Sequence, residues 1–116
     1  MSKAAYWQRG EAIDFTNTTG EKIEANEIVT VGALIGVAGT DIADGETGTL
    51  HIEGVFEMPK KASEEIEAGA AVCFKDGAVE KFADGETLAG VAVAKAAAED
   101  AVALVKINTG STAKKE

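Results

Sequence analysis

Apolar and polar residues alternate most clearly between Leu50 and Met58. In this range the even-numbered positions are apolar or glycine, and the odd-numbered positions are polar except for Val55. Successive side chains of a β-strand point to opposite faces, so the pattern predicts one strand with a buried face and a wetter face. Pro59 ends the predicted strand, because proline has no N–H to donate to a neighbouring strand.

A short apolar run, Leu34 to Ala38, precedes this strand, and a turn centred on Asp44-Gly45 separates the two. Two such segments on either side of a glycine-containing turn are typical of antiparallel strands. We expect this antiparallel pair, with one wet face, to organise the rest of the chain.

The remaining sequence predicts further short strands joined by tight turns. Asp76-Gly77, between two apolar segments, is a strong hairpin signal. Ser63 is suited to cap a single helical turn within residues 60–67. The alanine-rich residues 95–100 are interpreted as a loop. The further strands are predicted at residues 12–16, 21–25, 28–31, 70–74, 79–82, 88–94 and 101–107.

The predicted fold class is all-β: a small antiparallel β-barrel or sandwich of short strands and hairpins, with at most one short helical turn. Residues 10–108 are predicted to form a single β-rich domain, preceded by an arm, residues 1–9, and followed by a flexible tail, residues 109–116. The last strand is apolar on both faces through Val105, so we expect both faces to be covered by the core or by a partner chain.

Short strings recur along the chain and suggest an internal duplication. Ile-Glu-Ala occurs at residues 23–25 and 66–68, and Gly-Val-Ala occurs at residues 36–38 and 90–92. Their order fits a duplicated β unit with a hairpin inserted in the second copy. Ala-Asp-Gly-Glu-Thr also occurs twice, but its order differs between the halves, so we interpret it as a reused turn.

The composition restricts the classes of function that fit. A net charge of −9 and a pI near 4.6 disfavour nucleic-acid binding, which draws chiefly on Lys and Arg. No window approaches the roughly 20 apolar residues of a membrane helix, and the first residues do not resemble a signal peptide. We therefore expect a soluble protein made in the cytoplasm. The lone Cys73 excludes an intramolecular disulfide.

The sequence contains no convincing arrangement of catalytic or metal-binding residues. His51 is the only histidine and lies on the wetter face of its strand, whereas Cys73 lies in an apolar strand without an evident base. The two Asp-Gly-Glu turns lack the ligand density of a calcium loop. No glycine pattern matches a phosphate-binding loop. We predict no catalytic, cofactor or metal site, and hence a structural or binding protein rather than an enzyme.

The arm contains Tyr6 and Trp7, two of the chain's six aromatic residues (one Trp, one Tyr and four Phe). A tryptophan close to a terminus ordinarily covers the core of its own domain, and this is the first interpretation. The alternative is that the arm docks on another subunit, because aromatic and arginine side chains often anchor interfaces.

The chain resembles the capsid cement, or head decoration, proteins of tailed bacteriophages. The resemblance runs from about Gln8 to Ile107 and rests on three segments, GVAGTDIADGETGTLHIEGVFEMPK, IEAGAAVCFKDG and LAGVAVA. It implies a structural virion protein on the outer surface of the capsid, usually a homotrimer near threefold and quasi-threefold positions. Such proteins clamp neighbouring major capsid subunits after the shell expands.

The resemblance also implies candidate contact residues. Tyr6, Trp7, Gln8 and Arg9 correspond to the family's arm before the first strand and are the candidates for capsid contact. Arg9 departs from the family, in which a small residue or proline is more usual. Val102 and Leu104, on the two-sided apolar strand, are the candidates for the trimer interface.

Two other functions stay open on the sequence. One is a β-rich module that binds a carbohydrate or another ligand, for which six aromatic residues are few. The other is a minor tail or fibre component of the virion. Neither requires a membrane, nucleic acid or a cofactor.

Overall fold

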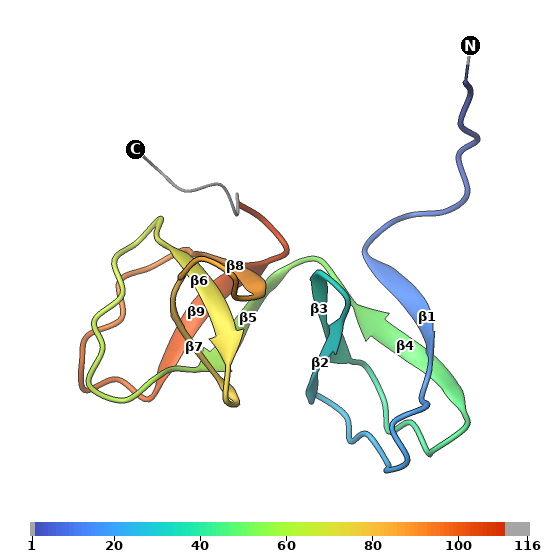
Figure 1. Cartoon of the computed structure of the whole chain (residues 1–116), viewed down its shortest axis with the longest axis horizontal. Helices are drawn as coiled ribbons and strands as arrows, with labels where there is room; N and C mark the ends of the chain where they lie inside the picture. The colour runs from blue at the N-terminus through green and yellow to red at the C-terminus, as the bar shows by residue number, and fades with distance from the viewer. Residues whose placement is uncertain (1, 111–116) are drawn as a thin grey trace.

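Backbone pairing divides the strands of the computed structural model, which describes residues 2–110, into two antiparallel sheets (Figure 1). The strand order is β1-β4-β3-β2 in the first sheet and β5-β9-β8-β6-β7 in the second. The sheets form a sandwich-like arrangement, and the described residues contain no helix, so the all-β prediction is confirmed. The strands are β1 Ala12–Thr16, β2 Ile28–Val31, β3 Leu34–Ala38, β4 Thr47–His51, β5 Val55–Pro59, β6 Ala71–Lys75, β7 Ala78–Lys81, β8 Leu88–Ala92 and β9 Val102–Ile107.

The single strand predicted from Leu50 to Pro59 is wrong, because this segment forms parts of two strands. The chain leaves β4 after His51 and enters β5 at Val55, in the other sheet. Gly54 lies in the break with φ 127°, a backbone conformation that glycine adopts far more readily than other residues. The period of two continues across the break, so the side-chain pattern alone does not reveal it.

The helical turn predicted within residues 60–67 is absent from the described chain. Ser63 has φ 63°, in the left-handed region, whereas a helix N-cap has an extended backbone. Residues 21–25 also differ from the prediction, because only an isolated bridge between Ile23 and Ile42 forms there.

The hairpin predicted at Asp76-Gly77 is confirmed between β6 and β7. The two turn residues have φ 52° and 81°, so both are left-handed, as a two-residue hairpin loop of this kind requires. Lys75 pairs with Ala78 on either side of the turn.

The two sheets repeat one topology, which bears out the predicted duplication, and their registers agree except for a bulge where β6 pairs with β8. Strands β1, β2, β3 and β4 correspond to β5, β6, β8 and β9, and β7 belongs to the hairpin inserted in the second copy. Ala12 pairs with His51 as Val55 pairs with Lys106, each pair at the start of its unit's first strand. The bridge between Ile23 and Ile42 recurs between Ile66 and Ala96. We call these halves the first unit and the second unit.

Two buried polar side chains occupy equivalent places in the two units. Asn17 donates from Nδ2 to the carbonyl of Glu21 at 2.7 Å, and the Lys60 ammonium donates to the carbonyl of Glu64. The spacing from Asn17 to Lys60 equals that from Glu21 to Glu64. Each buried donor is thereby paired with a loop carbonyl, as a buried polar group requires.

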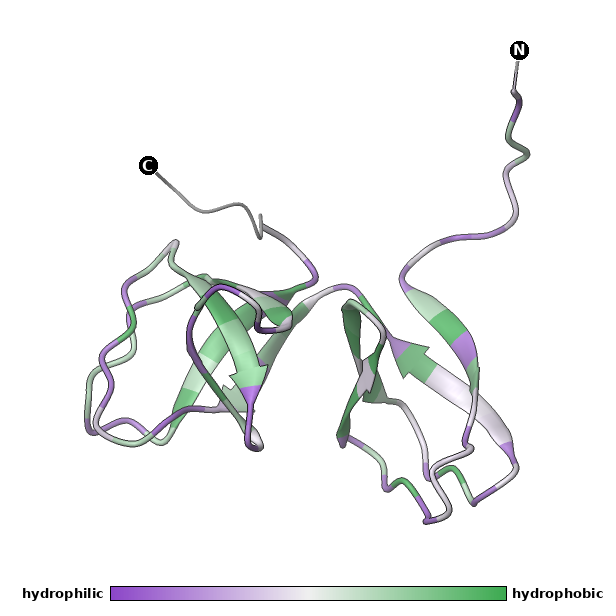
Figure 2. Ribbon diagram, viewed as in Figure 1, coloured by the Kyte–Doolittle hydropathy of each residue, from purple (hydrophilic) through white to green (hydrophobic). Residues whose placement is uncertain are grey.

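Each unit has its own apolar cluster (Figure 2). In the second unit the cluster is built mainly from strands β5 to β9, and Ile35 of β3 joins it from the first unit. The small core of the first unit centres on four fully or nearly fully buried residues: Ile23, Ala38, Ile42 and Leu50. A core made of aliphatic residues agrees with the low aromatic content.

Asn108 joins the two units at the end of β9. Its backbone N–H donates to Ala89 of the second unit at 2.8 Å. Its side-chain amide bonds to both backbone groups of Ile35 in the first unit, with the Ile35 N–H donating at 3.0 Å and the Ile35 carbonyl accepting at 2.8 Å. Nδ2 also donates to the carbonyl of Ile52 at 2.7 Å. Ile35 and Ala89 occupy equivalent positions in the two units. Asn108 therefore forms hydrogen bonds to the same position of both units.

We expect Asn108→Ala to lower the free energy of unfolding by about 1–3 kcal/mol, because it leaves the polar groups of Ile35 and Ile52 without their partner. Urea unfolding measures the change. Asn26→Ala is the matched control: Asn26 also has a left-handed backbone, φ 74° against 55° for Asn108, and its amide makes no hydrogen bond within residues 2–110. Equal losses in the two variants would mean that backbone strain, rather than the amide, accounts for the effect.

Candidate binding surfaces

The arm projects from β1 as an extended segment and does not cover the core (Figure 1). Tyr6 and Trp7 are 85% and 89% exposed, so the interpretation of Trp7 as a lid on its own domain is wrong. Gln8 makes a long hydrogen bond to the carbonyl of Ala12 at 3.4 Å. Arg9 lies 3.9 Å from the Glu11 carboxylate, a solvent-exposed ion pair that contributes little. Large aromatic side chains left in water are typical of a surface that binds another molecule.

A second apolar surface lies on the outer face of the second sheet. Val102 and Leu104 alternate along β9 with the buried Ala103 and Val105, so the core covers only one face of this strand. We define the β9 face by the four apolar side chains on this outer side, which are 41–54% exposed: Val55, Val93, Val102 and Leu104. Two exposed charged side chains lie among them, Glu57 opposite Leu104 and Lys106 opposite Val55.

The same positions of the first unit show that this apolar face is not a requirement of the fold. By register, Thr47 and Thr49 of β4 correspond to Val102 and Leu104 of β9. Ala12 corresponds in the same way to Val55. The first unit keeps the same pairing with smaller or more polar side chains. Folding alone therefore does not explain the valines and leucine of the second unit.

A groove separates the two units beside the start of β2. Its volume is about 440 Å³. Apolar side chains from both units line it, and the exposed Glu27 and Glu57 are among its lining residues. The Glu57 side chain alternates with Phe56 and Met58, so it lies on the outer face of β5. The full lining is Asn26, Glu27, Ile28, Val37, Phe56, Glu57, Met58, Pro59, Phe74 and Gly77. The sequence analysis did not find this groove, because its residues come together only through the placement of the two units.

Cys73 lies in the core, whereas His51 lies on the surface. Cys73 is fully buried, and burial raises the pKa of its thiol. Its sulfur donates to the carbonyl of Lys81 at 3.6 Å. A buried thiol that is harder to ionise is a poor nucleophile. His51 is exposed, as predicted from its position on the wetter face.

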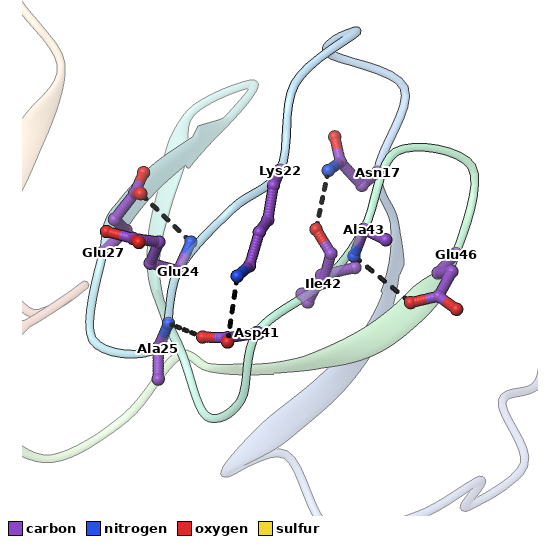
Figure 3. A network of polar contacts seen from close by, with 9 residues as sticks. All are labelled: Asn17, Lys22, Glu24, Ala25, Glu27, Asp41, Ile42, Ala43 and Glu46. Carbon is purple, nitrogen blue, oxygen red and sulfur yellow. Dashed lines mark hydrogen bonds and ion pairs between the residues drawn. The ribbon is translucent and has the colours of Figure 1, made fainter.

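Acidic side chains in the loops of the first unit act as caps for backbone N–H groups (Figure 3). Glu46 accepts from Ala43 at 3.2 Å, within the Asp-Gly-Glu turn that was considered for calcium. Asp41 accepts from Ala25 at 2.9 Å, and this hydrogen bond, with Lys22 nearby, lowers the pKa of its carboxyl group. Within residues 2–110, no group of three or more His, Cys, Asp or Glu side chains is placed to hold a metal ion.

The two sets of predicted contact residues lie in different units. Tyr6, Trp7, Gln8 and Arg9 precede β1 at the edge of the first sheet, whereas Val102 and Leu104 lie on β9 in the second sheet (Figure 1). The chain therefore presents separate surfaces, which suits a protein that contacts more than one neighbour. The sequence analysis missed Val93, because its place beside Leu104 depends on long-range strand pairing.

Of the comparisons with known proteins, only the one with family models finds a match. No curated protein and no solved structure matches the chain significantly. No helix long and apolar enough to cross a membrane occurs within residues 2–110. A family model described as phage cement protein matches residues 7–107. Because this match spans most of the chain, including the end of the arm and all nine strands of residues 2–110, the chain belongs to the phage cement protein family.

Proposed function

We propose that this protein binds the outer surface of the expanded phage capsid and stabilises it, as homotrimers at threefold and quasi-threefold positions. The observation that carries the proposal is the β9 face, whose exposed apolar side chains correspond to smaller or more polar ones at the equivalent positions of the first unit. In a family of cement proteins, such a difference is explained by contact with another chain. The partners are the major capsid protein and further copies of this chain.

The proposed mechanism is linkage between binding and the state of the shell. A ligand that binds one state of a lattice and not the other stabilises the bound state by mass action. A cement protein that contacts neighbouring capsid subunits in their expanded positions therefore opposes both a return of the shell to its unexpanded state and its rupture. Each contact is modest, but the gain is repeated at every site of the lattice.

We assign the two surfaces to different partners. The arm, residues 1–9, supplies the shell contact through Tyr6 to Arg9, since aromatic and arginine side chains dominate binding energy at many interfaces. Val102 and Leu104 supply the contact between copies. Residues 10–108 form the domain that positions both surfaces, and residues 111–116 of the proposed tail lie outside the described residues.

The first test is the molar ratio of this chain to the major capsid protein in purified particles. We expect a ratio near one if the protein covers the shell. A few copies per particle would instead support a tail or fibre component, and absence from particles would contradict the proposal.

We expect deletion of residues 2–9 to abolish binding to expanded shells that lack the protein, while leaving the melting temperature nearly unchanged. Tyr6 and Trp7 are almost fully exposed, so removing the arm takes little from the core. Co-sedimentation with shells measures binding, and calorimetry measures the melting temperature. Ser2→Ala is a control that keeps the aromatic and basic residues of the arm. Full binding by the truncated protein would place the shell contact elsewhere.

We expect Leu104→Lys to weaken trimer formation at least about tenfold, which corresponds to about 1.4 kcal/mol. The substitution places a charge in an apolar contact, where it loses water without gaining a partner. Sedimentation equilibrium measures the association. Thr49→Lys is the matched control, because Thr49 occupies the equivalent position in the first unit. If Leu104→Lys and Thr49→Lys associate like the unchanged protein, the β9 face is not the interface between copies.

A further inference from the structure

The outer edge of β2 has backbone groups that no described strand pairs. Thr30 lies opposite Ile35 in the register, but Ile35 uses both its N–H and its carbonyl for Asn108. In an antiparallel pair, such a non-bonded position turns its backbone groups away from the partner strand. The N–H and carbonyl of Thr30 therefore point to the free edge of the first sheet, where β2 is the last strand.

The second unit shows what occupies the equivalent edge. There β7 pairs with β6 along this side, and the Phe82 N–H donates to the carbonyl of Ala71 at 3.1 Å. Ala71 corresponds to Ile28 at the start of β2. The first unit lacks the inserted hairpin, so its edge has the same geometry without the strand that fills it.

The exposed edge of β2 lacks the usual protection against pairing. Its sequence is Ile-Val-Thr-Val, four β-branched residues without a charge or a proline. Natural edge strands are commonly guarded by charged residues, prolines or bulges, and an unguarded edge accepts an added strand. The groove between the units opens beside this edge, with Ile28 lining both.

The arm matches this site in shape and charge. In a paired strand its side chains would alternate, placing Lys3, Trp7 and Arg9 on one side and Tyr6 and Gln8 on the other. The first set is aromatic and basic, whereas the groove is mainly apolar with the acidic Glu27 among its lining residues. In its own chain the arm leaves from β1, at the opposite edge of the sheet from β2, and extends away (Figure 1).

We propose that the arm of one copy adds as a strand to the free edge of β2 in a neighbouring copy and inserts Trp7 into its groove. This inference rests on the proposed assembly of several copies and changes one part of it. Trp7 and Arg9 now belong to the contact between copies, in addition to the β9 face, rather than to the shell contact. The contact joins two different surfaces, so repetition generates a closed ring, such as a trimer, if the rotation closes. The other side of the arm, with Tyr6 and Gln8, then stays available for the shell.

Trp7 is the chain's only tryptophan, so its fluorescence reports on this contact directly. We expect the emission of the free protein to shift to shorter wavelength as concentration rises, with a parallel loss of quenching by acrylamide. The shift indicates transfer of the indole from water into an apolar groove. The experiment contains no shells, so its result is independent of whether the protein binds capsids.

Thr30→Pro tests the edge without disturbing the sheet. Proline removes an N–H that points outward, so the bonds between β2 and β3 are kept. We expect the concentration midpoint of the Trp7 shift to rise at least about tenfold. Thr30→Val, which keeps the N–H, should behave like the unchanged protein, and circular dichroism checks that both variants are folded.

Each of the following outcomes would overturn the inference. Trp7 emission typical of an indole in water at all concentrations means that the groove is not occupied by the arm. A shifted emission that does not depend on concentration means that the arm binds its own chain. A shift that survives unchanged in folded Thr30→Pro means that β2 is not the receiving edge. If Thr30→Pro is unfolded, Phe74→Ser in the groove replaces it, and an unchanged midpoint there also contradicts the proposal.

Discussion

The side-chain amide of Asn108 joins the two units, beside the packing of Ile35 into the core of the second unit. Each unit leaves the same position on an inner strand, Ile35 in β3 and Ala89 in β8, in need of a partner beyond the end of its sheet. The backbone of Asn108 supplies that partner in the second unit, and its amide supplies it in the first. An amide side chain carries the same donor and acceptor as a peptide, which is why one residue serves both.

Because the two units repeat one fold, a comparison of equivalent positions separates the residues that the fold requires from those that serve another purpose. Positions that keep their chemistry in both units serve the fold, such as the buried donors Asn17 and Lys60. Positions that differ at equal register identify what each unit does beyond folding. The outer face became apolar only in the second unit, and the edge strand was completed only there. The first unit therefore retains an open edge, and the second presents a hydrophobic face.

The sequence predicted the strands well where short-range patterns decide them. Asp76-Gly77 fixed its hairpin because both residues tolerate a left-handed backbone. The errors arose where distant partners decide the structure. Nothing local distinguishes an uninterrupted strand from the break at Gly54, and the conformation of Ser63 depends on its surroundings in the second unit. Val102 and Leu104 stood out because their strand is apolar on both sides, whereas the groove and the β2 edge exist only through long-range pairing.

The charge of the chain agrees with the contacts proposed for the arm. Copies with a net charge of −9 repel one another when they gather on a shell, and screening at physiological salt removes only the longer-range part. Residues 1–9 contain two basic residues, Lys3 and Arg9, and no acidic one. Extending this segment toward an acidic neighbour converts part of the repulsion into attraction. Its aromatic residues add a contact that salt does not weaken. An acidic domain with a basic, aromatic arm can therefore stay dispersed when free and still associate closely once its copies are held side by side.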